Sequence, residues 1–185
     1  MNRSEGCTDA AMDGAAANGN LAMLQWLHEN ATVLCTTKAM LPAAHIGRLD
    51  IITWLHVHYL HTYTAKAITK AAGQGHLKVV KWLHQNHSNE FVERAIKKAA
   101  AEGHLHVIQW LLVYCIKPST LLAAMKQAIS SEYYDVMLIL IAHVAGRYRN
   151  NDLREMICHW FEYQDIQYWF DEKYPPSDEG ARRPV

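Results

Sequence analysis

The sequence of 185 residues predicts an all-α solenoid of stacked helix pairs, because it copies itself at a fixed interval. A segment of the form G-x-L-x-x-[LIV]-x-W-L occurs four times, and a segment of the form A-[MI]-x-x-A-A stands before each copy. The Gly and the Trp of this segment each recur every 28 residues: Gly19, Gly47, Gly75 and Gly103, and Trp26, Trp54, Trp82 and Trp110. A constant period of this length is typical of architectures in which each repeat buries its apolar face against its neighbours.

Each repeat is predicted to contain two helices separated by the Gly. Thr8, Thr36 and Thr64 are predicted N-caps of the first, Ala-rich helix, because a Thr hydroxyl accepts a hydrogen bond from a free backbone N–H. Val92 and Thr120 occupy the same position in the next two repeats. The Gly ends the first helix by adopting positive φ, and the apolar pattern after it predicts a second, amphipathic helix of about ten residues.

Pro42 falls inside the predicted first helix of the second repeat. A Pro in a helix interior loses a hydrogen bond and costs about 3 kcal/mol. This helix is therefore predicted either to begin later, near Leu41, or to have a distorted first turn.

The pattern decays toward the C-terminus. Residues 123–143 fit a fifth repeat with a slip of one residue, in which Ser or Glu replaces the Gly and Ile or Leu replaces the Trp. A degenerate sixth helix pair, with Asp152 as its N-cap, is predicted after it, since terminal repeats face water. We therefore expect one domain over residues 8–173, with about five repeats and a degenerate cap from about residue 146. The segment 174–185 is predicted to be a disordered tail.

The motif A-A-x-x-G-[HNR]-L, which occurs at 15–21, 43–49, 71–77 and 99–105, resembles the core of the ankyrin repeat. The resemblance extends over roughly residues 8 to 143. Two features depart from the family: its T-P-L-H opening is replaced, and the period is 28 instead of about 33. Both departures predict short connections between repeats. Tetratricopeptide and HEAT repeats have longer periods, which fit the observed interval of 28 residues less well. The resemblance implies a non-catalytic scaffold or adaptor that binds another protein in the concave groove of the array.

Twelve histidines suggest a metal site, but their pattern favours a structural role. His28, His56 and His84 share one repeat position, which Leu112 occupies in the fourth repeat, so this position is predicted to be packed near a helix C-terminus. The Trp column is predicted to be core instead of a platform for bases. We find no motif for a catalytic nucleophile or a phosphate loop. Neither a metal nor another cofactor is therefore expected.

Composition limits the classes of partner and the cellular compartment that the sequence favours. The formal net charge is zero, which disfavours nucleic acid as the partner, and no apolar stretch approaches the length of a membrane span. The four cysteines form no CxxC pair and the N-terminal residues lack a signal-peptide pattern, so an intracellular protein is expected, cytoplasmic in preference to nuclear. Other interpretations are a fragment of a longer adaptor and a secreted effector given without its leader.

Charge is distributed unevenly and supplies the candidate site. Residues 60–100 contain seven Lys and Arg against two acids, whereas residues 151–179 contain two against eight. Lys38, Lys66 and Arg94 share one repeat position, and Lys70 and Lys98 share another on the same helix face. The candidate partner-binding residues are this ladder, its neighbour Lys97, and polar side chains at the variable positions before each Gly: Lys38, Lys66, Lys70, Arg94, Lys97, Lys98, Asn18, His45, Gln74 and Glu102.

The ladder predicts a protein partner with an acidic segment, bound by a monomer. The first alternative is that the ladder binds nucleic acid or another polyanion, for which a steep salt dependence would be diagnostic. The second alternative is a metal-dependent enzyme that uses the His clusters, which the structural interpretation of those histidines disfavours.

Overall fold

A computed structural model describes residues 9–31, 39–59, 65–86, 91–115 and 117–145 of the chain. The helices within these residues are α1 (Asp9–Ala17), α2 (Leu21–Asn30), α3 (Met40–His45), α4 (Leu49–His58), α5 (Ala65–Gly73), α6 (Leu77–Asn86), α7 (Val92–Ala101), α8 (Leu105–Leu111), α9 (Pro118–Ser130) and α10 (Tyr134–Ala145). The chain divides into two compact units, Met1–Met137 and Leu138–Val185. The first unit contains α1 to α9 and the first turn of α10.

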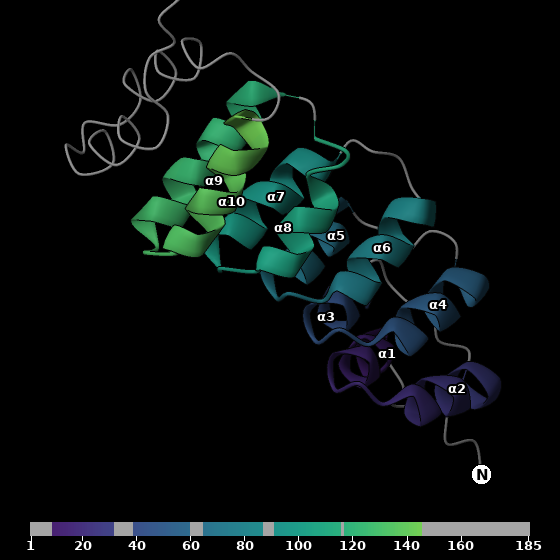
Figure 1. The fold of residues 1–185 in the computed structure, drawn as a ribbon. Coiled ribbons are helices and arrows are strands. Elements are labelled where there is room, and N and C mark those ends of the chain that lie inside the picture. The colour runs from purple at the N-terminus through teal and green to yellow at the C-terminus, as the bar shows by residue number, and fades with distance from the viewer. Residues whose placement is uncertain (1–8, 32–38, 60–64, 87–90, 116, 146–185) are drawn as a thin grey trace, which may run out of the picture. The chain divides into compact units, whose positions relative to one another are not determined.

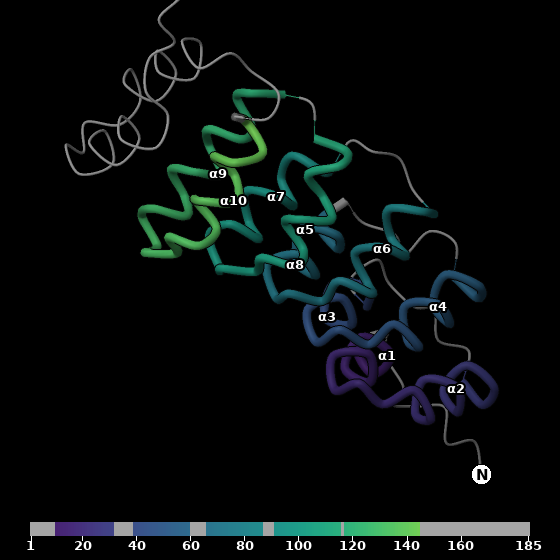
Figure 2. Tube along the Cα trace, viewed as in Figure 1, coloured from purple at the N-terminus to yellow at the C-terminus, as the bar shows by residue number. Residues whose placement is uncertain are grey.

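The helices of the first unit form two rows, which confirms the predicted helix-pair solenoid (Figure 1). In one row, the first helices α1, α3, α5, α7 and α9 pack each against the next (Figure 2). In the other, α4 packs against α6 and α6 against α8. The connections α4–α5, α6–α7 and α8–α9 are five or six residues long, as the short period predicts, whereas the connection α2–α3 has nine residues, 31–39.

The core lies between the two rows and is built from the repeated apolar positions. The first helices α1, α3, α5 and α7 each contribute their Ala-Ala pair, such as Ala71 and Ala72 in α5, which are fully buried. Small side chains there let neighbouring first helices approach closely. The second helices α4, α6 and α8 each contribute three aliphatic residues, such as Val79, Val80 and Leu83 in α6, all at most 1% exposed, whereas α2 contributes two, Leu24 and Leu27. Burying these side chains contributes roughly 1.5–3 kcal/mol each.

The turn between the two helices of each repeat requires a left-handed residue. Gly75 has φ of +75° and Gly103 has φ of +76°, and the other two repeat glycines are similar. After each turn the next backbone N–H bonds back into the first helix, as from His76 N to Ala71 O at 2.9 Å. In the fifth repeat Glu132 has φ of +62°, and Tyr133 N bonds to Ala128 O at 2.9 Å. Glu132 therefore occupies the Gly position, which resolves the predicted slip of one residue.

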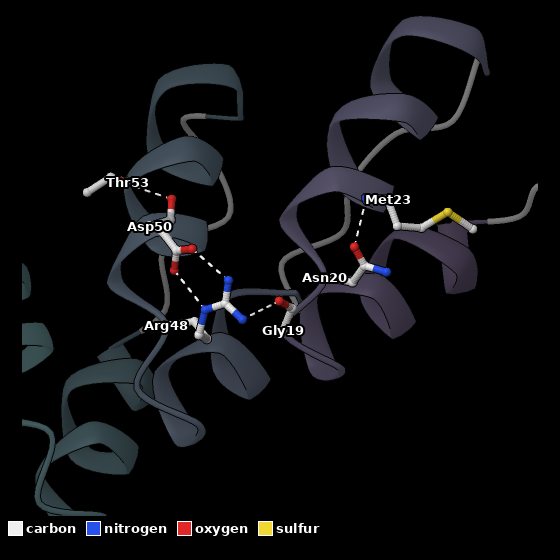
Figure 3. A network of polar contacts seen from close by, with 6 residues as sticks. All are labelled: Gly19, Asn20, Met23, Arg48, Asp50 and Thr53. Atoms are coloured by element: carbon white, nitrogen blue, oxygen red, sulfur yellow. Dashed lines mark hydrogen bonds and ion pairs between the residues drawn. The ribbon is translucent and has the colours of Figure 1, made fainter.

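The residue after each Gly links its repeat to the preceding one. In the second repeat the Arg48 guanidinium donates to the carbonyl oxygen of Gly19 and forms an ion pair with Asp50 at 2.7 Å (Figure 3). His76 Nε2 lies 2.8 Å from His45 O, and His104 Nε2 lies 3.1 Å from Gly73 O. The residue after the repeat Gly, which is His in the third and fourth repeats, therefore connects the turn of its own repeat to the turn of the preceding repeat.

Asn20 holds the same position in the first repeat and caps its own helix instead. Its Oδ1 accepts a hydrogen bond from Met23 N at 3.0 Å (Figure 3). This bond satisfies one of the free N–H groups at the start of α2.

The prediction that the Trp column is buried core is wrong. Trp26 is 53% exposed, and Trp54, Trp82 and Trp110 are half-buried. The His of each repeat meets the Trp of the next edge to face: the ring centroids of His28–Trp54, His56–Trp82 and His84–Trp110 are 5.4, 5.1 and 5.1 Å apart. Trp and His stand two residues apart, about 200° around the helix, so they occupy opposite flanks of the buried stripe. The W-L-H motif therefore joins neighbouring second helices.

His84 lies packed near the C-terminal end of α6, but its Nδ1 does not cap the helix. Its Nδ1 is buried without a hydrogen-bond partner, and its ring packs on the ring of Tyr114, with the two ring centroids 4.2 Å apart. A C-terminal carbonyl group of α6 is bonded by Asn86 instead, whose Nδ2 donates to Trp82 O at 2.8 Å. In the first repeat, Asn30 Nδ2 donates to Trp26 O in the same way.

His84 should make the fold sensitive to mild acid. Burial lowers the pKa of His84 below its ordinary value of 6.5, so below that pH the unfolded chain binds this proton more readily than the folded chain. The contribution of His84 to stability is therefore complete above about pH 6.5 and declines as the pH falls. We expect His84→Leu, which copies Leu112 of the fourth repeat, to reduce the loss of urea stability between about pH 7.5 and 5.5. An identical pH dependence in both proteins would contradict this assignment.

Two expectations about helix starts are decided by the structure. The first helix of the second repeat begins at Met40, so Pro42 lies in its first turn, where its absent N–H has no intrahelical partner to lose. Thr120 is not an N-cap: it is 3% exposed inside α9, whose N-cap is Lys117 with Pro118 following. The caps predicted at Thr8, Thr36 and Thr64, and the helix pair predicted from Asp152, lie outside the described residues.

Candidate functional site

The basic ladder lies on two consecutive first helices. Lys66 and Lys70 are exposed on α5, and Arg94 and Lys98 are exposed on α7. Both segments form amphipathic helices, in which one face is buried in the core and the charged positions face outward. The buried Ala residues are Ala67, Ala71, Ala72, Ala95, Ala99 and Ala100. Lys38, the first residue predicted for the ladder, lies outside the described residues.

An open pocket of about 380 Å³ lies beside this ladder. Its lining residues come from α5, α7 and α9: Thr69, Arg94, Lys97, Lys98, Ala101 and Gln127. Three of them are cationic, and Thr69 and Gln127 add neutral groups that donate and accept hydrogen bonds. We call the pocket together with Lys66 and Lys70 the basic patch. Because the patch is cationic and open to solvent, it is suited to binding carboxylates or phosphates of a ligand that stays at the surface.

One cation of the basic patch is already paired. Lys98 Nζ lies 2.6 Å from Glu102 Oε1, and both side chains are less than half exposed. Donation from Lys98 lowers the pKa of Glu102 below its usual range, so the carboxylate is charged at neutral pH. The aliphatic part of Lys98 crosses Gly73, where a Cβ would lie 2.7 Å from Lys98 Cγ. Lys98 is thereby held in place, and the remaining cations of the basic patch have the greater freedom to meet a ligand.

The polar residues predicted before each Gly do not line the pocket, although Asn18, His45 and Gln74 are exposed and Glu102 is half-buried. Asn18 and His45 lie at the ends of the first two first helices, and the carbonyl oxygen of His45 accepts the bond from His76. Gln74 Nε2 donates to Gly73 O at 3.1 Å. Glu102 takes part only through its ion pair with Lys98. Ala101, which occupies the repeat position of His45, does line the pocket.

Sequence reasoning did not find Thr69 and Gln127. Gln127 follows from the slip of one residue: counted back from the left-handed Glu132, it occupies the position of Lys98. Thr69 occupies the position of Lys97 one repeat earlier. A search for charge alone passes over both residues, whereas the repeat alignment identifies them.

The described histidines make contacts within the fold. His106 Nε2 lies 2.8 Å from Gly75 O, and His58 packs on Trp54 with ring centroids 4.6 Å apart. Within the described part of the chain, no group of three His, Cys, Asp or Glu side chains is arranged to hold a metal ion. Two members of the predicted clusters, His61 and His87, lie outside that part.

The comparisons with known proteins agree with the helix-pair repeats. Residues 68–112, from α5 to the end of α8, match the family model described as ankyrin repeats (many copies). A search of curated proteins found no match. None of the described helices combines the length and the apolar character needed to cross a lipid bilayer. The third and fourth repeats of this chain are therefore similar to ankyrin repeats.

Proposed function

We propose that this protein is a non-catalytic scaffold or adaptor that binds an acidic segment of a partner protein at the basic patch. Ankyrin repeats are generally protein–protein interaction modules, which supports the general class of function. The observation that favours this location is the pocket lined by Arg94, Lys97 and Lys98, with Lys66 and Lys70 on the neighbouring helix.

The chemistry of the basic patch favours carboxylates on a flexible or helical segment. Guanidinium and ammonium groups form their strongest hydrogen bonds with ionised acceptors, and Arg94 can bind a carboxylate with two parallel bonds. The cations occur on successive repeats, so an extended segment with several acidic side chains could meet more than one of them. Such contacts at an exposed surface supply specificity and association rate more than affinity.

Charge reversal tests the proposal. We expect the variant with Lys66, Lys70, Arg94 and Lys98 all changed to Glu to lose binding of a fluorescent peptide containing six consecutive glutamates, measured by anisotropy. The single change Arg94→Glu should weaken binding roughly tenfold, because it replaces an attraction by a repulsion at close range. The melting temperature of Arg94→Glu should change little, because substitutions at exposed positions outside ion pairs usually alter stability by about 0.5 kcal/mol or less.

Lys78→Glu is the matched control. Lys78 is exposed on α6, in the other row of helices, and the substitution changes the net charge by the same amount as Arg94→Glu. Equal weakening by the two single variants would mean that overall charge drives binding, and the basic patch would then be the wrong site. A single-stranded oligonucleotide serves as the competing probe: tighter binding of it than of the peptide, with a steep salt dependence, would favour the polyanion alternative.

A further inference from the structure

A second pocket lies at the turn of the fifth repeat, and its charged lining residues are acidic, whereas those of the basic patch are cationic. Its volume is about 210 Å³, and its lining includes Gly103, Glu132, Tyr133, Tyr134 and Asp135. The ring of Tyr133 lies directly over Gly103, where a Cβ would come within 2.5 Å of it. The turn of the fourth repeat therefore fixes the position of one aromatic wall.

The polar and aromatic groups of this pocket are available to a ligand. Tyr133 is 40% exposed and Tyr134 is 55% exposed. The carboxylates of Glu132 and Asp135 are also exposed, and neither takes part in an ion pair among the described residues. Two cations of the neighbouring repeats, Lys98 and Lys117, have Glu102 and Glu93 as their ion-pair partners. Within the described part of the chain, the carboxylates of Glu132 and Asp135 are thus left without an ion-pair partner, in a pocket that two tyrosines also line.

We infer that this pocket binds the guanidinium group of an arginine from a partner protein. A guanidinium is planar, donates several hydrogen bonds to carboxylates and stacks on aromatic faces. One guanidinium can therefore contact both the carboxylates and the tyrosine rings of this pocket. An ammonium group offers a point charge and no planar face, so Lys should bind less well. The pocket does not depend on the basic patch, so this inference stands or fails separately from the proposed function.

An amide-resolved NMR titration tests the inference. The probe is the peptide acetyl-Gly-Arg-Gly-amide, and its neutral control carries citrulline in place of Arg, which keeps the planar shape and removes the charge. We expect the Arg peptide to shift the amide signals of Gly103, Leu105 and residues 133–136, with millimolar affinity, as befits a single side chain. The citrulline peptide should shift them much less. Equal shifts from both peptides, or shifts spread over acidic residues elsewhere, would overturn the inference.

Glu132→Gly separates binding from folding. Four repeats have Gly at this position, so the substitution relieves a left-handed non-Gly residue while it removes one carboxylate. We expect its melting temperature to equal or exceed that of the original protein, while the affinity for the Arg peptide falls roughly fivefold. Asp135→Asn should have a similar effect on affinity. Glu29→Gln, at an exposed position of α2, is the matched control and should bind normally. Unchanged affinity in both Glu132→Gly and Asp135→Asn would refute the site.

Discussion

Gly75→Ala is expected to lower the free energy of unfolding by about 2 kcal/mol or more. An L-residue with a side chain loses roughly 1–2 kcal/mol in the left-handed region, and Gly75 has φ of +75°. The added methyl group would also lie 2.7 Å from Nδ1 of His104, the side chain that bonds to the preceding turn. The two costs add, because the clash can be relieved only by moving the ring that joins the repeats. Urea unfolding followed by circular dichroism measures the loss.

Gly14→Ala is the matched control, since it makes the same chemical change inside a helix. Gly14 lies in α1, and a Cβ there would meet nothing within 4 Å. A Gly in a helix interior is less stable than Ala by about 0.5–1 kcal/mol, so this variant should be slightly stabilised. Opposite signs for the two substitutions are expected. A loss of stability at Gly14 equal to that at Gly75 would contradict the role assigned to the turn.

Trp82→Ala is expected to cost about 2 kcal/mol, whereas Trp26→Ala should cost less than about 1 kcal/mol. Trp82 is half-buried and receives the edge of the His56 ring at an interplanar angle of 84°. Trp26 holds the same repeat position but is 53% exposed. The difference therefore measures the contact between neighbouring repeats and not the Trp side chain itself. Urea midpoints of the two variants give the comparison, and equal costs would show that the His–Trp contact does not stabilise the stack.

The sequence predicts the repeats and their turns because these follow from local patterns. The four glycines occupy the left-handed turns that their spacing predicts, and the aliphatic positions of the second helices are buried. The Trp column was misjudged because hydrophobicity alone does not say which flank of a helix a side chain occupies. Counting at 3.6 residues per turn from Val79, Val80 and Leu83 places Trp82 at the edge of the buried stripe.

The links between repeats could not be predicted, because they join residues that are close only after folding. Arg48 donates to Gly19 O across 29 positions, and His106 meets Gly75 O across 31. Repetition shows that His76 and His104 are equivalent, but it does not show what their rings contact. For the basic patch, the sequence supplied the cations on α5 and α7, whereas the helix packing brought Gln127 of α9 to the same pocket.

The central claim is that the basic patch selects an acidic partner protein. The most direct measurement is affinity capture from cell extract, followed by mass spectrometry, with the original protein, Lys78→Glu and the fourfold charge reversal run in parallel. We predict that the original protein and Lys78→Glu capture the same proteins, that the fourfold variant loses them, and that the lost proteins contain acidic segments which cross-link to α5 or α7. Capture of the same proteins by all three would contradict the claim.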